Sequence, residues 1–272
     1  MKTTVILKLL ALTLILTVPV LTAHAQGISE NELIIYYSFD EDSLGDGEVL
    51  DGSENENHGL IRGDLNVVEG KVNECMAFPG GAANFISVQN HHYADVFPEL
   101  SMAVWIKTAQ RGMIASWDRS EFFRFGAGDD VLGNLTFAGF DVCCPIKDWH
   151  GNVEVTDDQW HHIVVTFDAE MKRIYVDGEL DVEAATDTDN KMIGKAVTRY
   201  GFIGIGSEAP AFNGNVGPTW AFNGLMDEFL MFHRALSAEE VTHLANVSGN
   251  PFTPVEPADK LSITWGQIKN TR

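Results

Sequence analysis

The 272-residue chain carries 39 acidic and 18 basic side chains, a formal net charge of −21 at pH 7. So acidic a surface repels nucleic-acid phosphates and anionic lipid, which argues against a nucleic-acid or anionic-membrane partner. Three cysteines are too few for a disulfide framework. In an oxidising compartment either member of the Cys143-Cys144 pair can bridge to Cys75, which leaves one thiol over.

Residues 1–25 predict a signal peptide. Lys2 precedes an apolar run that ends near Val20, and Ala23-His24-Ala25 fits a small-x-small cleavage site. The run is short for a bilayer span and contains Lys8, which favours cleavage over a retained anchor. We therefore expect a secreted, extracytoplasmic protein with no membrane insertion after cleavage.

The first half of the mature chain predicts short strands separated by turns. A strand over 33–39 is followed by an acidic turn and by the turn formers of residues 51–59, which cannot hold a strand. A short strand is expected over 59–61. Strands over 75–78 and 85–88 are expected to pair across Pro79-Gly80-Gly81, and an apolar strand follows over 100–106.

The clearest pattern lies in residues 158–182. Ile163, Val165 and Phe167 alternate with their neighbours at the period of a strand that has one face on a core. A second β-rich run follows, and Asp177-Gly178 then predicts a tight hairpin turn.

Two strands and a helix are predicted near the C-terminus. The strands are expected over 202–206 and 222–232. Ser237 and Glu240 then form a capping-box pattern for a short helix.

Three segments occur in a characteristic order: the acidic loop over 51–59, the strand that begins Trp160-His161-His162, and the helix start Arg234-Ala235-Leu236-Ser237. This order resembles the laminin G-like domains of the concanavalin A-like lectin/glucanase superfamily, in their bacterial exported form. The resemblance implies an all-β fold: a two-sheet antiparallel β-sandwich (a concanavalin A-like jelly roll) with a short C-terminal helix. The domain is expected over 30–247. Residues 248–272 form a Pro-containing linker and a short tail, which either docks on the sandwich or awaits a partner.

The resemblance also implies a structural calcium ion. In the superfamily a cation often ties the N-terminal acidic loop to an acidic residue of the terminal strand, and the matching positions here are Asp40, Asp51, Asn57 and Asp227. Calcium prefers such oxygen ligands. The residues leave a second interpretation open, in which Asp40 and Asp51 are solvated turn formers and Asp227 accepts from backbone amides.

Glycan recognition is the expected function. Lectin-like sandwiches bind sugars through exposed aromatic rings and hydrogen-bonding side chains. The candidate residues of these types in expected loops are Trp117, Arg124, Trp149, Asn213 and Trp220. We therefore predict a non-catalytic module that binds an extracellular carbohydrate or protein partner; the oligomeric state is not predicted.

Two other functions stay open. Retaining glycosidases of the superfamily need two carboxylates on one face of a strand, in a Glu-x-Asp-x-x-Glu pattern, and this chain has no such spacing. A glycan-active hydrolase would therefore need an acid pair from separate strands. The third candidate is a structural or adhesion module of a cell-surface assembly, which would use the acidic surface and the tail.

Overall fold

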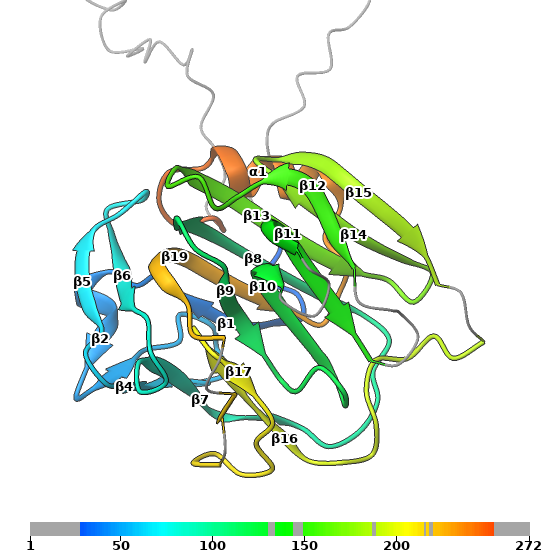
Figure 1. Ribbon diagram of the computed structural model, residues 1–272, viewed down its shortest axis with the longest axis horizontal. Helices are drawn as coiled ribbons and strands as arrows, with labels where there is room; N and C mark the ends of the chain where they lie inside the picture. The colour runs from blue at the N-terminus through cyan, green and yellow to red at the C-terminus, as the bar shows by residue number, and fades with distance from the viewer. Residues whose placement is uncertain are drawn as a thin grey trace, which may run out of the picture. The chain divides into compact units, whose positions relative to one another are not determined.

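The computed structural model describes residues 28–129, 134–143, 149–186, 189–214, 216–217 and 220–252 (Figure 1). The predicted signal peptide, Cys144 and nearly all of the predicted tail lie outside these ranges. Within the described ranges, no helix has both the length and the apolar character needed to cross a membrane.

In the described residues, most of the strands form two antiparallel sheets. The eight-stranded sheet has the order β15-β14-β13-β8-β19-β6-β5, with β1 also paired to β19. Its strands are β1 (Leu33–Tyr37), β5 (Asn66–Glu69), β6 (Glu74–Pro79), β8 (Leu100–Lys107), β13 (Trp160–Phe167), β14 (Met171–Val176), β15 (Glu179–Ala185) and β19 (Asn223–Phe232).

The nine-stranded sheet has the order β12-β11-β10-β9-β16-β7-β4-β3-β2. Its strands are β2 (Leu44–Gly45), β3 (Glu48–Val49), β4 (Gly59–Arg62), β7 (Phe85–Tyr93), β9 (Gly112–Ser116), β10 (Phe123–Asp129), β11 (Asn134–Val142), β12 (His150–Glu154) and β16 (Arg199–Ile203). The remaining elements are η1 (Glu41–Ser43), the pair β17 (Gly206–Ser207) and β18 (Val216–Gly217), and α1 (Ala238–Asn246).

The hydrophobic core lies between the two sheets. Ile163 and Val165 of β13 belong to the same buried cluster as Phe125 of β10 and Phe140 of β11. The predicted all-β sandwich with one short helix is therefore confirmed.

The predicted hairpin is present, with a turn of the expected kind. Val176 pairs with Glu179 across Asp177 (φ 52°) and Gly178 (φ 86°), so both turn residues are left-handed, as a two-residue hairpin turn requires. The other face of β13 is buried as well, because Val164 packs in the cluster that contains Leu244 of α1.

One predicted strand pair is wrong. Residues 75–78 fall in β6, which pairs with β5 and β19, whereas residues 85–88 fall in β7, which pairs with β4 and β16. Gly80 and Gly81 both have positive φ and end β6, so the chain passes from one sheet to the other instead of forming a hairpin.

The cysteine expectation is also corrected. Cys75 of β6 is a free, buried thiol whose Sγ lies 3.4 Å from the carbonyl oxygen of Glu69. Cys143, which follows β11 in the other sheet, is disulfide-bonded. Neither member of the vicinal pair therefore bridges to Cys75.

The acidic loop over 51–57 covers the second edge of β1. Both carboxylate oxygens of Asp51 accept backbone N–H groups, from Tyr36 of β1 (2.8 Å) and from Asn57 (2.9 Å). The side-chain amide of Asn57 donates to the carbonyl of Ile34 (2.9 Å), and that of Asn55 donates to the carbonyl of Leu33 (2.7 Å). The loop thus satisfies backbone groups that an edge strand would otherwise expose.

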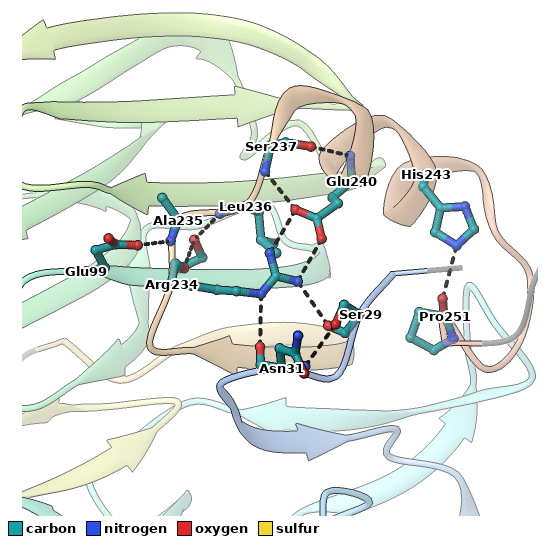
Figure 2. Close-up of polar contacts among 11 residues, drawn as sticks. Ser29, Asn31, Glu99, Arg234, Ala235, Leu236, Ser237, Glu240, His243 and Pro251 are labelled. Atoms are coloured by element: carbon teal, nitrogen blue, oxygen red, sulfur yellow. Dashed lines mark hydrogen bonds and ion pairs between the residues drawn. The ribbon is translucent and has the colours of Figure 1, made fainter. Parts of the chain in front are cut away.

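Arg234 joins the two ends of the described chain, as Figure 2 shows. Its guanidinium donates to the carbonyls of Ser29 and Asn31, both at 2.9 Å, and forms a forked pair with the Glu240 carboxylate at 2.7 and 2.8 Å. Glu240 also accepts from the backbone of Ser237, which completes the predicted capping box of α1. The segment before β1 and the helix are therefore held by one side chain.

The variant Arg234→Ala is expected to lower the free energy of unfolding by about 2–4 kcal/mol, because it removes several charge-assisted hydrogen bonds at a half-buried position. Arg234→Lys should fall in between, since an ammonium group cannot make the fork. Urea denaturation measures both. The control is Lys191→Ala, which breaks an exposed ion pair with Glu170. It should lower the free energy of unfolding by less than about 0.5 kcal/mol. Equal losses in Arg234→Ala and Lys191→Ala would contradict this role.

His162 on β13 provides a test of burial through pH. Its ring contacts Trp105 at 5.0 Å between centroids, and burial lowers its pKa from 6.5 to about 3, against a small opposing effect of Asp177. Below pH 6.5 His162 is therefore protonated in the unfolded chain, whereas it stays neutral in the native state down to about pH 3. His162 thus destabilises the native state by about 1.4 kcal/mol for each pH unit below that value.

As pH falls from 6.5 to 4.5, the free energy of unfolding of the His162→Gln variant should rise relative to that of the unaltered chain by about 1.4 kcal/mol for each pH unit. Urea denaturation at each pH measures this difference. His92→Gln, at an exposed position, is the matched control and should show no such slope. Parallel stability curves for the unaltered chain and His162→Gln would refute the prediction.

Candidate functional site

A row of directly paired residues crosses the outer face of the nine-stranded sheet. Residues opposite one another on neighbouring strands share a face, and the register runs through Asp141, Arg124, Ser116, Phe202, Ser87, Leu60 and Glu48. The adjacent row, which includes Phe125, Ala115, Ile203 and Ile86, belongs to the core. We call the first row the outer row.

A buried ion pair occupies one end of the outer row. Arg124 and Asp141 are each 2% exposed and form a hydrogen-bonded pair between β10 and β11. The guanidinium of Arg124 lies 4.9 Å from the ring centroid of Trp220, and the backbone N–H of Trp149 donates to Asp141 at 3.2 Å. Three of the predicted ligand-binding residues therefore contact or form this ion pair: Arg124, Trp149 and Trp220.

Lys172 of β14 reaches this end from the other sheet. Its ammonium donates to the carbonyl of Phe140 at 2.7 Å and lies 5.1 Å from the ring centroid of Trp149. Burial lowers its pKa to about 7, and the neighbouring Asp141 opposes that shift. Lys172 belongs to no sequence motif, although its parity with Ile174 and Val176 indicates an inward side chain.

An open groove lies at the middle of the outer row, where Phe202 and Ser87 are paired. Its volume is about 380 Å³, and its lining residues are Arg62, Gly63, Ala83, Phe85, Ser87, Phe202, Asn213 and Gly214. We call it the Arg62 groove. The rings of Phe85 and Phe202 meet edge to face at 5.6 Å between centroids, so the groove combines an aromatic pair with polar groups.

Arg62 at the end of β4 supplies the charge of this groove. Its Nε donates to the Ser87 hydroxyl at 3.3 Å, its Nη2 donates to Oδ1 of Asn213, and its guanidinium lies 5.7 Å from the Phe212 ring centroid. Asn213 is exposed. Asn213 was predicted from the sequence, whereas Arg62 was missed because its direction depends on the pairing of β4 with β7.

Trp117 does not belong to either group. It is fully buried, and its ring packs against Phe123 at 5.3 Å and Tyr93 at 6.1 Å between centroids. Trp117 follows β9 outside the strand, as expected, but the expected exposure is corrected: its ring is part of the core, where it cannot stack on a sugar.

The four predicted calcium ligands lie in two groups. Asp51 and Asn57 are occupied by the hydrogen bonds along β1 described above. Asp227 is fully buried, and its Oδ2 accepts from the backbone of Lys71 (2.9 Å) and Val72 (2.8 Å). Asp40 is half-buried, and its Oδ1 accepts from the backbone of Glu74 at 3.0 Å.

Asp227 keeps one oxygen without a partner. Its Oδ1 is buried and makes no hydrogen bond. Burial raises the pKa of Asp227 to about 7, and the charge of Asp40 contributes to that rise. The neighbouring Glu228 is similarly buried, accepts from the Tyr36 hydroxyl at 2.8 Å, and has its pKa raised to about 8. The unpartnered Oδ1 of Asp227 is a hard oxygen of the kind that calcium prefers.

A bulge explains why both acids are buried. Adjacent residues of a regular strand point to opposite faces. The register of β19 against β8 shifts between Asp227 and Leu230, and Glu228 has φ 52°. Within the described ranges, no group of three or more histidine, cysteine, aspartate and glutamate side chains is arranged to hold a metal by itself. Further calcium ligands at Asp227 would have to include backbone carbonyls or water.

Comparison with known proteins identifies the fold family. The sequence model of the laminin G domain family described as concanavalin A-like lectin/glucanases superfamily matches residues 80–242. The neuronal pentraxin receptor of Rattus norvegicus is 24% identical over 225 residues, which are 77% of this chain and 45% of that protein. The chain spans less than half the length of the curated relatives that it matches.

Two solved structures show the same fold. Domain 4 of the extracellular arabinanase AbnA from Geobacillus stearothermophilus, in complex with arabinotriose, has a TM-score of 0.57 at 18% identity; the match covers 79% of this chain and 98% of that domain. The binding domain of botulinum neurotoxin DC in complex with SialylT has a TM-score of 0.55 at 11% identity, and the match covers 80% and 52%. At these identities the likeness concerns the fold alone.

Proposed function

Because the chain belongs to the concanavalin A-like lectin/glucanases superfamily as a laminin G domain, we propose that it is an exported, non-catalytic module that binds extracellular carbohydrate in the Arg62 groove. Export is supported by the N-terminal sequence pattern. It predicts that the mature protein begins after Ala25, which N-terminal sequencing of the exported protein tests.

The composition of the Arg62 groove carries the proposal. Sugar sites combine an apolar surface for the ring with a few fixed hydrogen-bonding groups. The half-buried ring of Phe85 offers the first, while Arg62 and Asn213 offer the second; Phe202 and Ser87 are buried and form the floor of the groove. Proteins of this fold in complex with arabinotriose or SialylT give independent support for a binding role.

The absence of an acid pair in the groove supports a non-catalytic role. Glycoside hydrolysis uses two carboxyl groups that flank the bond to be cut. Among the described residues that line the Arg62 groove, none is Asp or Glu. The adjacent acids Asp227 and Glu228 are 0% and 7% exposed and lie in the other sheet.

A glycan array followed by titration calorimetry tests the proposal. We expect Asn213→Ala to weaken binding of the best array ligand about tenfold, since it removes a hydrogen-bonding amide at the groove. Asn66→Ala, at an exposed position of β5 in the other sheet, should leave the affinity unchanged. Release of reducing ends would favour the hydrolase, and binding of a protein partner without any glycan would favour the adhesion module.

We also propose that Asp227, with Asp40, takes part in a structural calcium site. The unpartnered buried Oδ1 of Asp227 supports this smaller ligand set. Asp51 and Asn57 are left out of the set, because their side chains already make hydrogen bonds to β1 and within the 51–57 loop.

Calcium should therefore raise the melting temperature of the unaltered chain, and a chelator should reverse the effect. Binding at one hundred times Kd stabilises a native protein by about 2.7 kcal/mol. The variant Asp227→Asn should lose the response to calcium, whereas Asp157→Asn, on an exposed turn, should keep it. If neither calcium nor chelator changes the melting temperature of the unaltered chain, the proposed calcium site is refuted.

A further inference from the structure

Arg62 differs from the other arginines whose contacts are resolved. Arg124, Arg173, Arg199 and Arg234 each form an ion pair with a carboxylate. The hydrogen bonds of Arg62 go instead to the neutral oxygens of Ser87 and Asn213. Within the described ranges no carboxylate lies at ion-pair distance from Arg62, although the chain has 39 acidic residues.

The contacts of Arg62 fix its position without neutralising its charge. Arginine has five N–H donors, of which the bonds to Ser87 and Asn213 use two. The remaining donors form part of a planar fork that matches a carboxylate or sulfate group. A half-buried guanidinium that is held in place by neutral partners is therefore prepared to accept an anion.

The rest of the groove favours a sugar as the carrier of that anion. Arg62 is the one charged residue among the described residues that line the groove, and aromatic rings lie beside it. The volume of about 380 Å³ is at the small end of the range for ligand pockets, about 300–1,000 Å³. The net charge of −21 repels an anion at long range only, because physiological salt screens exposed charges beyond about 8 Å.

We propose that the Arg62 groove selects glycans that carry an anionic group, a carboxylate or a sulfate, and that Arg62 recognises this group directly. This inference rests on the proposed function, because it assigns the ligand class of the same groove. It also explains why the arginine of the groove has no carboxylate partner of its own.

The test compares anionic glycans with the neutral glycans from which they derive. The probes are lactose, 3′-sialyllactose and 3′-sulfolactose, together with cellotriose and its C6-oxidised uronate, each titrated by calorimetry. We expect the unaltered chain to bind at least one anionic probe about tenfold or more tightly than its neutral parent. The sialylated, oxidised and sulfated probes separate a carboxylate from a sulfate.

Variants at Arg62 then identify the recognising group. Arg62→Gln should reduce the preference for the anionic probe to about one, and Arg62→Lys should keep part of it. Lys191→Gln, which removes a remote surface cation, should keep all of it. Thermal melting of each variant shows whether it is folded.

Three results would overturn the inference. If a neutral glycan binds as well as its anionic partner, the proposed function stands and the charge selection fails. If Arg62→Gln weakens neutral and anionic probes equally, Arg62 contacts hydroxyl groups and does not read the charge. If the unaltered chain binds none of the probes and no glycan on the array, the inference and the proposed function both fail.

Discussion

The forked ion pair between Arg234 and Glu240 holds in place the layer that covers the eight-stranded sheet, which consists of α1 and the segment before β1. The same guanidinium fixes the chain before β1, and the same carboxylate caps α1. Helix α1 and the segment before β1 are too short to be stable alone. Their position on the sheet therefore depends on this pair and on the apolar cluster around Leu244 beneath it.

The two sheets differ in what covers their outer faces. His162 and Glu228 lie beside Leu244 of α1, and Asp227 lies beneath the backbone of Lys71 and Val72. All three are therefore buried, and their pKa values shift in the directions that burial dictates. The outer face of the nine-stranded sheet has no such helix in the described part of the chain. There the Arg62 groove stays open, and the buried pair of Arg124 and Asp141 lies at one end of the same row.

Side-chain type predicted several members of this face, and side-chain direction explains the errors. Arg124 and Asn213 lie on this face, and Trp220 packs on Arg124. Trp149 instead packs against the core, with its ring beside Lys172. Trp117 follows β9 with the opposite parity, so its ring also lies in the core. Arg62 could not be selected, because a lone arginine after a four-residue strand carries no signal until β4 is paired with β7.

The sequence by itself determined the family, the alternating strands, the Asp177-Gly178 turn and the capping box of α1, because each of these rests on neighbours in the chain. Only the tertiary structure decided that β6 and β7 join different sheets, that Cys75 stays unpaired, and that the Asp51 carboxylate accepts a hydrogen bond from the edge of β1. It also decided that Arg62 meets Asn213, 151 positions away. Local spacing fixes the turn, strand or helix that a segment forms, whereas contacts between distant segments depend on strand order and register, which no short pattern encodes.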